Sequence, residues 1–118
     1  MYKFEKYRVY HSALKLVRIV YDVIKILSED ERFGLADQLR RSVISIVLNI
    51  AEGTGSLGDK EFKNFLRHAL KSLYETVAGL KIAEEIFDAD VTKALEQANL
   101  VGRELNALIK TINKSAKS

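Results

Sequence analysis

The stretch GTGSLG carries glycines at positions 53, 55 and 58, which is the G-x-G-x-x-G spacing of dinucleotide-binding loops. Such a loop binds pyrophosphate only where it leaves a β-strand and opens a helix within a βαβ unit. The residues on both sides of this stretch instead repeat with a helical period, so no strand precedes it. We interpret the stretch as a connection between two helices, in which Gly53 ends the first helix and Gly55 and Gly58 permit positive φ angles.

Basic residues recur at spacings of three, four and seven in three parts of the chain, which places them in rows on helix faces. Such rows can neutralise the phosphates of a nucleic acid. The candidate phosphate contacts are Lys60, Lys63, Arg67 and Lys71 in one segment, Arg103, Lys110 and Lys114 in a later one, and Lys15 and Arg18 near the N-terminus. The alternative is an ordinary solvated helix face, since acidic residues such as Glu75 and Glu104 lie nearby. A stacking aromatic would favour RNA, and Tyr74 is the one aromatic close to these rows.

A narrow strip of polar residues crosses the otherwise apolar segment at 35–52. Its members are Gln38, Ser42, Ser45, Asn49 and Glu52, at spacings of four, three, four and three. One interpretation is a functional polar cluster completed by Arg40 and Arg41. The other, which we favour, is that Asn49 and the serines satisfy hydrogen bonds inside an interface and fix its register, because a buried polar group must first be paired.

Residue types that can act in catalysis or bind metals are present, but their spacing does not bring them together into one site. The two histidines, His11 and His68, fall in different segments, and neither completes a Glu-x-x-His pattern. Glu75, Glu84 and Glu85 share one segment without matching ligands elsewhere, and no set of nucleophile, base and orienting group can be assembled from the spacing. We therefore expect no enzyme activity, no metal, no cofactor and no small-molecule substrate.

Composition favours a helical domain. The chain has 118 residues, of which 47% are hydrophobic and 30% charged, with no proline and six glycines. Because strand-rich domains need frequent turn residues, this indicates a single all-α domain. The absence of cysteine rules out a disulfide framework, and the net charge of +3 is only mildly basic. No apolar run is long enough for a membrane span and no secretion signal is evident, so we expect a soluble cytoplasmic protein without membrane partners.

Apolar periodicity divides the chain into four helices joined by short connections. The expected helices cover residues 6–27, 35–52, 60–87 and 91–113 of one domain spanning 1–118. An acidic run and a glycine at 28–34 form the first connection, Asp59 caps the third helix, and residues 88–90 form the last connection. Gly102 permits close approach of the last helix to a neighbour. Four long helices with short connections predict an antiparallel up-down-up-down four-helix bundle.

The predicted helix at 35–52 is apolar over most of its circumference. A helix of this kind is buried on more than one side. We reason that a small four-helix monomer covers one face of a helix but not most of it, and we predict that this segment also packs against another subunit. The predicted oligomer interface comprises Leu39, Ser42, Ile46, Asn49, Ile50 and Glu52.

Two stretches beside the glycine-rich connection resemble a bacterial four-helix bundle family labelled 23S rRNA-intervening-sequence protein. They are ERFGLADQLRRSVISIVLNIAEGTG at 31–55 and KEFKNFLRHALKSLYE at 60–75, and weaker similarity covers nearly the whole chain. One departure is Val47, where the family commonly has proline, so the second helix should be straighter here. The resemblance implies the bundle fold and assembly into a ring of five.

The resemblance indicates function only in outline. Some members are encoded within intervening sequences of large-subunit ribosomal RNA genes, and a related branch is the accessory protein of diversity-generating retroelements, which binds a reverse transcriptase and nucleic acid. The first hypothesis is therefore a non-enzymatic homopentamer that binds RNA or a ribonucleoprotein through its basic helix faces. The second is a protein-interaction scaffold that recruits a partner such as a reverse transcriptase without contacting RNA.

Overall fold

The computed structural model describes residues 1–27 and 34–117, and within these ranges it contains four α-helices, one short 3-10 helix and no β-strand. The elements are η1 (Lys3–Lys6), α1 (Arg8–Ile26), α2 (Leu35–Thr54), α3 (Asp59–Phe87) and α4 (Thr92–Lys117). The prediction of an all-α chain with four long helices is therefore confirmed. Residues 28–33 of the predicted first connection lie outside the described residues.

The helix boundaries differ from the predicted ones by a few residues. α1 begins at Arg8 because Tyr7 is extended, with φ −92° and ψ 129°, and separates α1 from η1. α4 continues to Lys117, beyond the predicted end at residue 113. Asp59 is the first residue of α3 rather than its cap, and Gly58 occupies the cap position. Asp59 there still places a negative charge in the first turn, which the helix dipole favours.

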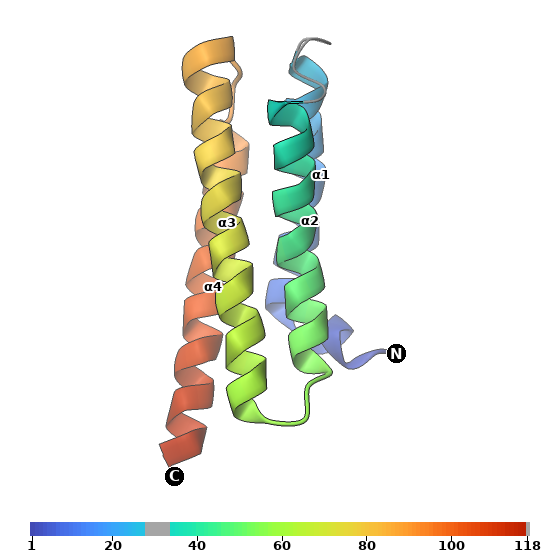
Figure 1. The fold of residues 1–118 in the computed structure, drawn as a ribbon, viewed down its shortest axis with the longest axis vertical. Helices are drawn as coiled ribbons and strands as arrows, with labels where there is room; N and C mark the ends of the chain where they lie inside the picture. The colour runs from blue at the N-terminus through green and yellow to red at the C-terminus, as the bar shows by residue number, and fades with distance from the viewer. Residues whose placement is uncertain (28–33, 118) are drawn as a thin grey trace.

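The four α-helices lie side by side around a shared apolar core in a rod measuring 51 × 22 × 20 Å (Figure 1). α1 and α3 each pack against both α2 and α4, and the α2–α3 pair has the most extensive contact. The connection between α2 and α3 lies at the lower end of the rod in Figure 1, where α4 also ends. Leucines with no solvent exposure fill the core from all four helices, namely Leu16, Leu39, Leu66, Leu80 and Leu105. Within the described ranges, no helix combines the length and the apolar content that a membrane span requires.

Most of the α2 residues assigned to an oligomer interface are instead buried inside the single chain. Leu39, Ile46 and Ile50 have no solvent exposure, and Ser42 is 5% exposed. The physical reason is that α2 packs against two neighbours, α1 and α3, which together cover most of its circumference. The burial of these four residues therefore requires no second subunit.

The apolar side chains that α2 leaves in solvent are different ones. Ile44 is 37% exposed and Leu48 is 54% exposed. Their spacing of four places them on the same outer face of the helix. Glu52, another residue of the predicted interface, is exposed as well.

A chain of hydrogen bonds links α2 to α3. The Thr76 hydroxyl, fully buried, donates a bond of 2.8 Å to the Ser42 hydroxyl, and the hydroxyls of Ser45 and Ser72 share another of 2.8 Å. The half-buried Asn49 side chain donates to the carbonyl oxygen of Ser45 at 2.9 Å and to its hydroxyl at 3.0 Å. Ser42, Ser45 and Asn49 are therefore hydrogen-bonded within the single chain, partly inside α2 and partly to α3.

The glycines at 53, 55 and 58 do not provide left-handed backbone. No described glycine has a positive φ, and Gly53 lies within α2 rather than after it. Gly53 is instead required by close packing, because a Cβ at this position would lie 2.9 Å from Cβ of Phe65 and 3.0 Å from Cδ1 of Phe62. The aromatic side chains of α3 thus contact the backbone of α2 directly.

Gly53→Ala is expected to lower the free energy of unfolding by about 1–2 kcal/mol. The added methyl group forces Phe65 and its backbone to move, which costs about 1–3 kcal/mol, and the better helix propensity of alanine offsets up to about 1 kcal/mol of that cost. Chemical denaturation of both proteins measures the difference. Gly58→Ala is the matched control, because no atom lies within 4 Å of its added Cβ, and it should change stability by less than about 0.5 kcal/mol. Equal effects of the two substitutions would contradict the packing described here.

Two aspartates shape the connection between α3 and α4. Asp88 has φ 54° and ψ 29°, the left-handed conformation that ends α3. The Asp90 carboxylate accepts a bond of 3.0 Å from the backbone N–H of Thr92, which caps the start of α4. This bond and one from the Thr92 hydroxyl hold the pKa of Asp90 below its usual value. The cap therefore contributes stability above the ordinary carboxyl pKa and loses it as the pH falls through the lowered one.

Candidate nucleic-acid interface

One row of basic residues follows the outer face of α3. Lys60, Arg67 and Lys71 are exposed, and Lys63 is half-buried. Because an α-helix turns once every 3.6 residues, spacings of three and four bring these side chains to one side. At 1.5 Å per residue, the row extends about 16 Å along the helix, which is long enough to contact several phosphates of one strand.

Two contacts define the register of α4 against this row. The Nζ of Lys63 donates a hydrogen bond of 2.8 Å to Oδ1 of Asn113. Further along both helices, a Cβ on Gly102 would lie 3.3 Å from Cδ2 of Leu73, so the α4 backbone comes close to α3 there. Lys63 is therefore level with Asn113, and Leu73 is level with Gly102.

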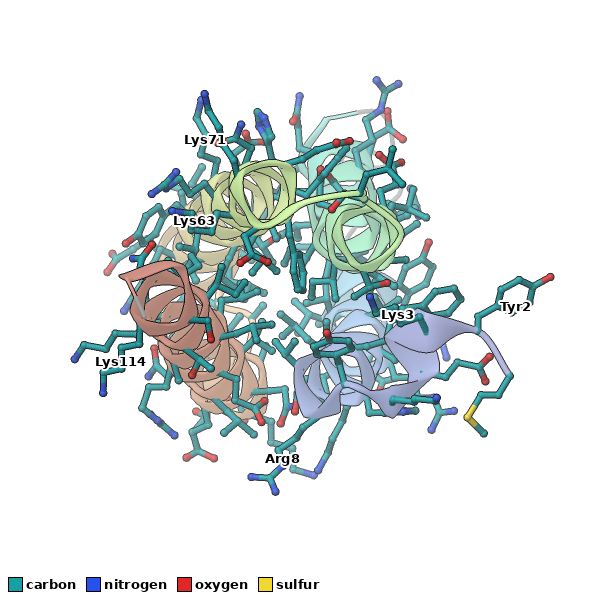
Figure 2. All side chains as sticks on the ribbon, turned by 90° about the horizontal axis from the view of Figure 1, so that it is seen from below. Tyr2, Lys3, Arg8, Lys63, Lys71 and Lys114 are labelled. Carbon is teal, nitrogen blue, oxygen red and sulfur yellow. The ribbon has the colours of Figure 1, made fainter. Side chains whose placement is uncertain are left out.

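This register brings the basic row of α4 beside that of α3. Arg103, Lys110 and Lys114 are all exposed. Figure 2 shows Lys63, Lys71 and Lys114 pointing outward on the side of the molecule that α3 and α4 form. We call the combined surface the α3–α4 basic face, which consists of Lys60, Lys63, Arg67, Lys71, Arg103, Lys110 and Lys114.

Charge is segregated along the α3–α4 half of the rod. Residues 59–74 and 103–115, at the end with the α2–α3 connection, contain seven basic and three acidic residues. Residues 75–102, at the other end, contain two basic and six acidic residues. A solvated helix pair of no particular function would mix the two signs. The basic end is therefore the part of this surface with the potential to attract a polyanion.

The basic residues of α1 do not belong to the α3–α4 basic face. Lys15 lines a groove of about 680 Å³ between α1 and α4, together with the acidic side chains of Asp22 and Asp90. Arg103 also lines this groove, so it lies at the α1 edge of the α3–α4 basic face. Arg18 is exposed and does not line this groove. Because the groove mixes both signs of charge, it is a poorer phosphate site than the α3–α4 basic face.

The residues considered for catalysis are separated in the structure. His11 donates a hydrogen bond of 2.7 Å from Nε2 to the Glu5 carbonyl oxygen, and His68 is exposed on α3. Arg41, which the sequence suggested for a polar cluster on α2, instead forms an ion pair of 3.2 Å with Asp37 on the surface of that helix. Among the residues that the structure describes, no three or more His, Cys, Asp or Glu side chains are grouped so as to hold a metal ion.

Tyr74 is the residue whose position sequence reasoning undervalued. It is 70% exposed on α3, one turn beyond Lys71. The signal was its spacing of three from Lys71 and seven from Arg67, which continues the basic row. A large aromatic ring in solvent at the end of a row of cations is available to a ligand that combines negative charge with flat rings.

Comparison with known proteins places these features in context. A family model described as 23S rRNA-intervening sequence protein matches residues 5–114. A solved structure from Bacteroides thetaiotaomicron, described as a protein with unknown function from the S23 ribosomal protein family, is similar with a TM-score of 0.63. The similarity covers 93% of this chain and 99% of that one at 24% sequence identity, so it supports the fold alone. No curated protein matches the chain.

Proposed function

We propose that this chain, which belongs to the 23S rRNA-intervening sequence protein family, is a non-enzymatic RNA-binding protein that contacts phosphates through the α3–α4 basic face. The observation that carries the proposal is the charge segregation along α3 and α4, where seven basic and three acidic residues gather at one end. The Lys63–Asn113 hydrogen bond supports it, because it holds the two basic rows in register before any RNA arrives.

We further propose that the chain forms an antiparallel up-down-up-down bundle that self-associates, with a ring of five as the form that the family resemblance suggests. The exposed pair Ile44 and Leu48 on α2 supports self-association, because among the described residues these two neighbouring apolar side chains are left 37% and 54% exposed. In a ring, the basic face would be repeated in every copy. Repetition converts a weak phosphate site into a strong one through the effective concentration of the neighbouring sites.

The salt dependence of RNA binding tests the proposed function. Binding of a fluorescent 20-nucleotide RNA is measured by anisotropy between 50 and 300 mM KCl. If four to seven basic residues of one subunit contact phosphates, the slope of log K against log salt is expected to be about −3 to −5. A peptide nucleic acid of the same sequence, which has an uncharged backbone, is the control and should bind far more weakly.

The alternative function predicts a different result. A scaffold that recruits a reverse transcriptase or another protein without touching RNA would show no salt-dependent RNA binding. Equal retention of the RNA and the uncharged analogue, or a slope near zero, would therefore contradict the phosphate-binding proposal and favour the scaffold.

A further inference from the structure

We infer that Tyr74 is a base-stacking platform and that the α3–α4 basic face therefore prefers single-stranded RNA to duplex RNA. The inference rests on the proposed function and adds to it the conformation of the RNA and the residue that recognises it. Its starting point is the exposure of the Tyr74 side chain, 70%, on a helix whose other aromatic residues, Phe62, Phe65 and Phe87, are half-buried.

The position of Tyr74 connects it to the basic row of α3. On α3 it follows Arg67 by seven residues and Lys71 by three, so the three side chains lie on one face of the helix. Across the seam, Leu73, the residue before Tyr74, is level with Gly102 of α4. The ring is therefore bordered by cations on its own helix.

Tyr74 is free to accept a base. Within the described residues, its hydroxyl takes part in no hydrogen bond and its ring in no aromatic pair. Beyond Tyr74, α3 becomes acidic through Glu75, Glu84 and Glu85, so an RNA strand following the basic residues would end its contact near this ring. The ring thus lies at the boundary of the positive surface.

The chemistry of stacking selects the conformation of the RNA. In a duplex the bases are paired and stacked inside the helix, and proteins contact mainly phosphates and 2′-hydroxyls. In a single strand the bases are available to stack on an aromatic ring while the phosphates contact nearby cations. A lone exposed tyrosine beside Arg67 and Lys71 offers both contacts to one nucleotide and its neighbours.

The test compares Tyr74→Leu with wild type on an unstructured 20-nucleotide RNA and on a 20-base-pair duplex, by fluorescence anisotropy in 0.1 M salt. We expect Tyr74→Leu to weaken single-strand binding about 5- to 100-fold, the range for loss of one aromatic–base stack, and to change duplex binding less than twofold. Tyr74→Phe, which keeps the ring and removes the hydroxyl, should bind the single strand within twofold of wild type.

Tyr2→Leu is the matched control. Tyr2 is 73% exposed, yet Figure 2 shows it on the side of the molecule opposite to Lys63, Lys71 and Lys114. Its loss should leave both affinities unchanged. Circular dichroism should show the same helix content in all variants, because Tyr74 and Tyr2 are both exposed.

The outcomes separate this inference from the proposed function. Suppose that wild type binds both RNAs and that both affinities fall as salt rises. If Tyr74→Leu then leaves both affinities unchanged, or lowers both by the same factor, Tyr74 does not stack on a base and only this inference is overturned. If wild type binds neither RNA, the proposed function is overturned and the inference with it.

Discussion

Replacing Lys63, Arg67 and Lys71 together by glutamate is expected to weaken RNA binding about 100-fold or more in 0.1 M salt. Each phosphate contact on a single strand contributes about 0.7 to the slope of log affinity against log salt, so removing three contacts alone costs about two orders of magnitude under these conditions. The introduced carboxylates add repulsion to this loss. Anisotropy titrations at several salt concentrations measure it, and the slope itself should become less steep by about 2.

A second triple variant with the same change in net charge is the control. Lys3, Arg18 and Lys25 are exposed and lie outside the α3–α4 basic face, and Figure 2 shows Lys3 on the opposite side of the molecule from Lys63. Their replacement by glutamate should weaken binding far less. If both triple variants lose affinity equally, the RNA responds to the total charge of the protein and not to the α3–α4 basic face. Thermal unfolding of each variant checks that the loss of the Lys63–Asn113 hydrogen bond has not disturbed the fold.

Ile46→Ala is expected to lower the free energy of unfolding by about 2–5 kcal/mol. Ile46 has no solvent exposure within a single chain, so truncating it removes buried apolar surface and leaves a cavity that the helices on either side only partly fill. Chemical denaturation measures the effect. Wild type and variant must be compared at a concentration where their masses in solution agree, because self-association adds to apparent stability. An unchanged stability would contradict the placement of Ile46 in the core.

Leu48→Asp, two residues further along α2, provides the contrast. Leu48 is 54% exposed, so the substitution should leave the helix content unchanged. If the outer face of α2 mediates self-association, the mass measured by light scattering should fall to that of one chain at concentrations where wild type is larger. A wild-type protein that is a single chain at every concentration would overturn the proposed assembly, and an unchanged mass for Leu48→Asp would exclude this face.

The sequence was sufficient for the fold class, the number of long helices and the family. For α2 it left the covering neighbours undetermined, because the apolar circumference alone led to the expectation of a second subunit. Periodicity shows how much of a helix is apolar but not how many neighbours cover it. In the structure α1 and α3 both pack on α2, and close contact with α3 depends on small side chains such as Ser42 and Ser72 that hydropathy scales count as polar. Only Ile44 and Leu48 remain as large exposed apolar residues of α2.

The candidate site could be predicted residue by residue but not as one surface. The rows on α3 and α4 follow from helical spacing, which depends on local geometry alone. Their alignment depends on tertiary contacts, namely the hydrogen bond between Lys63 and Asn113 and the close approach at Gly102. Neither pairing has a local sequence signal. For the same reason, sequence spacing grouped Lys15 with the other basic residues, although it lies in a groove of mixed charge between α1 and α4, which Arg103 also lines.

The opposite charges at the two ends of the α3–α4 layer give this half of the rod a permanent electric dipole moment along the long axis. A polyanion approaching at a distance exerts a torque on this dipole and turns the positive end toward itself before any side chain makes contact. The encounter is thereby oriented in advance, and fewer collisions end in an unproductive pose. In an assembly whose subunits stand parallel, the individual moments would add, so that the whole particle would present one rim to the nucleic acid and repel it from the other.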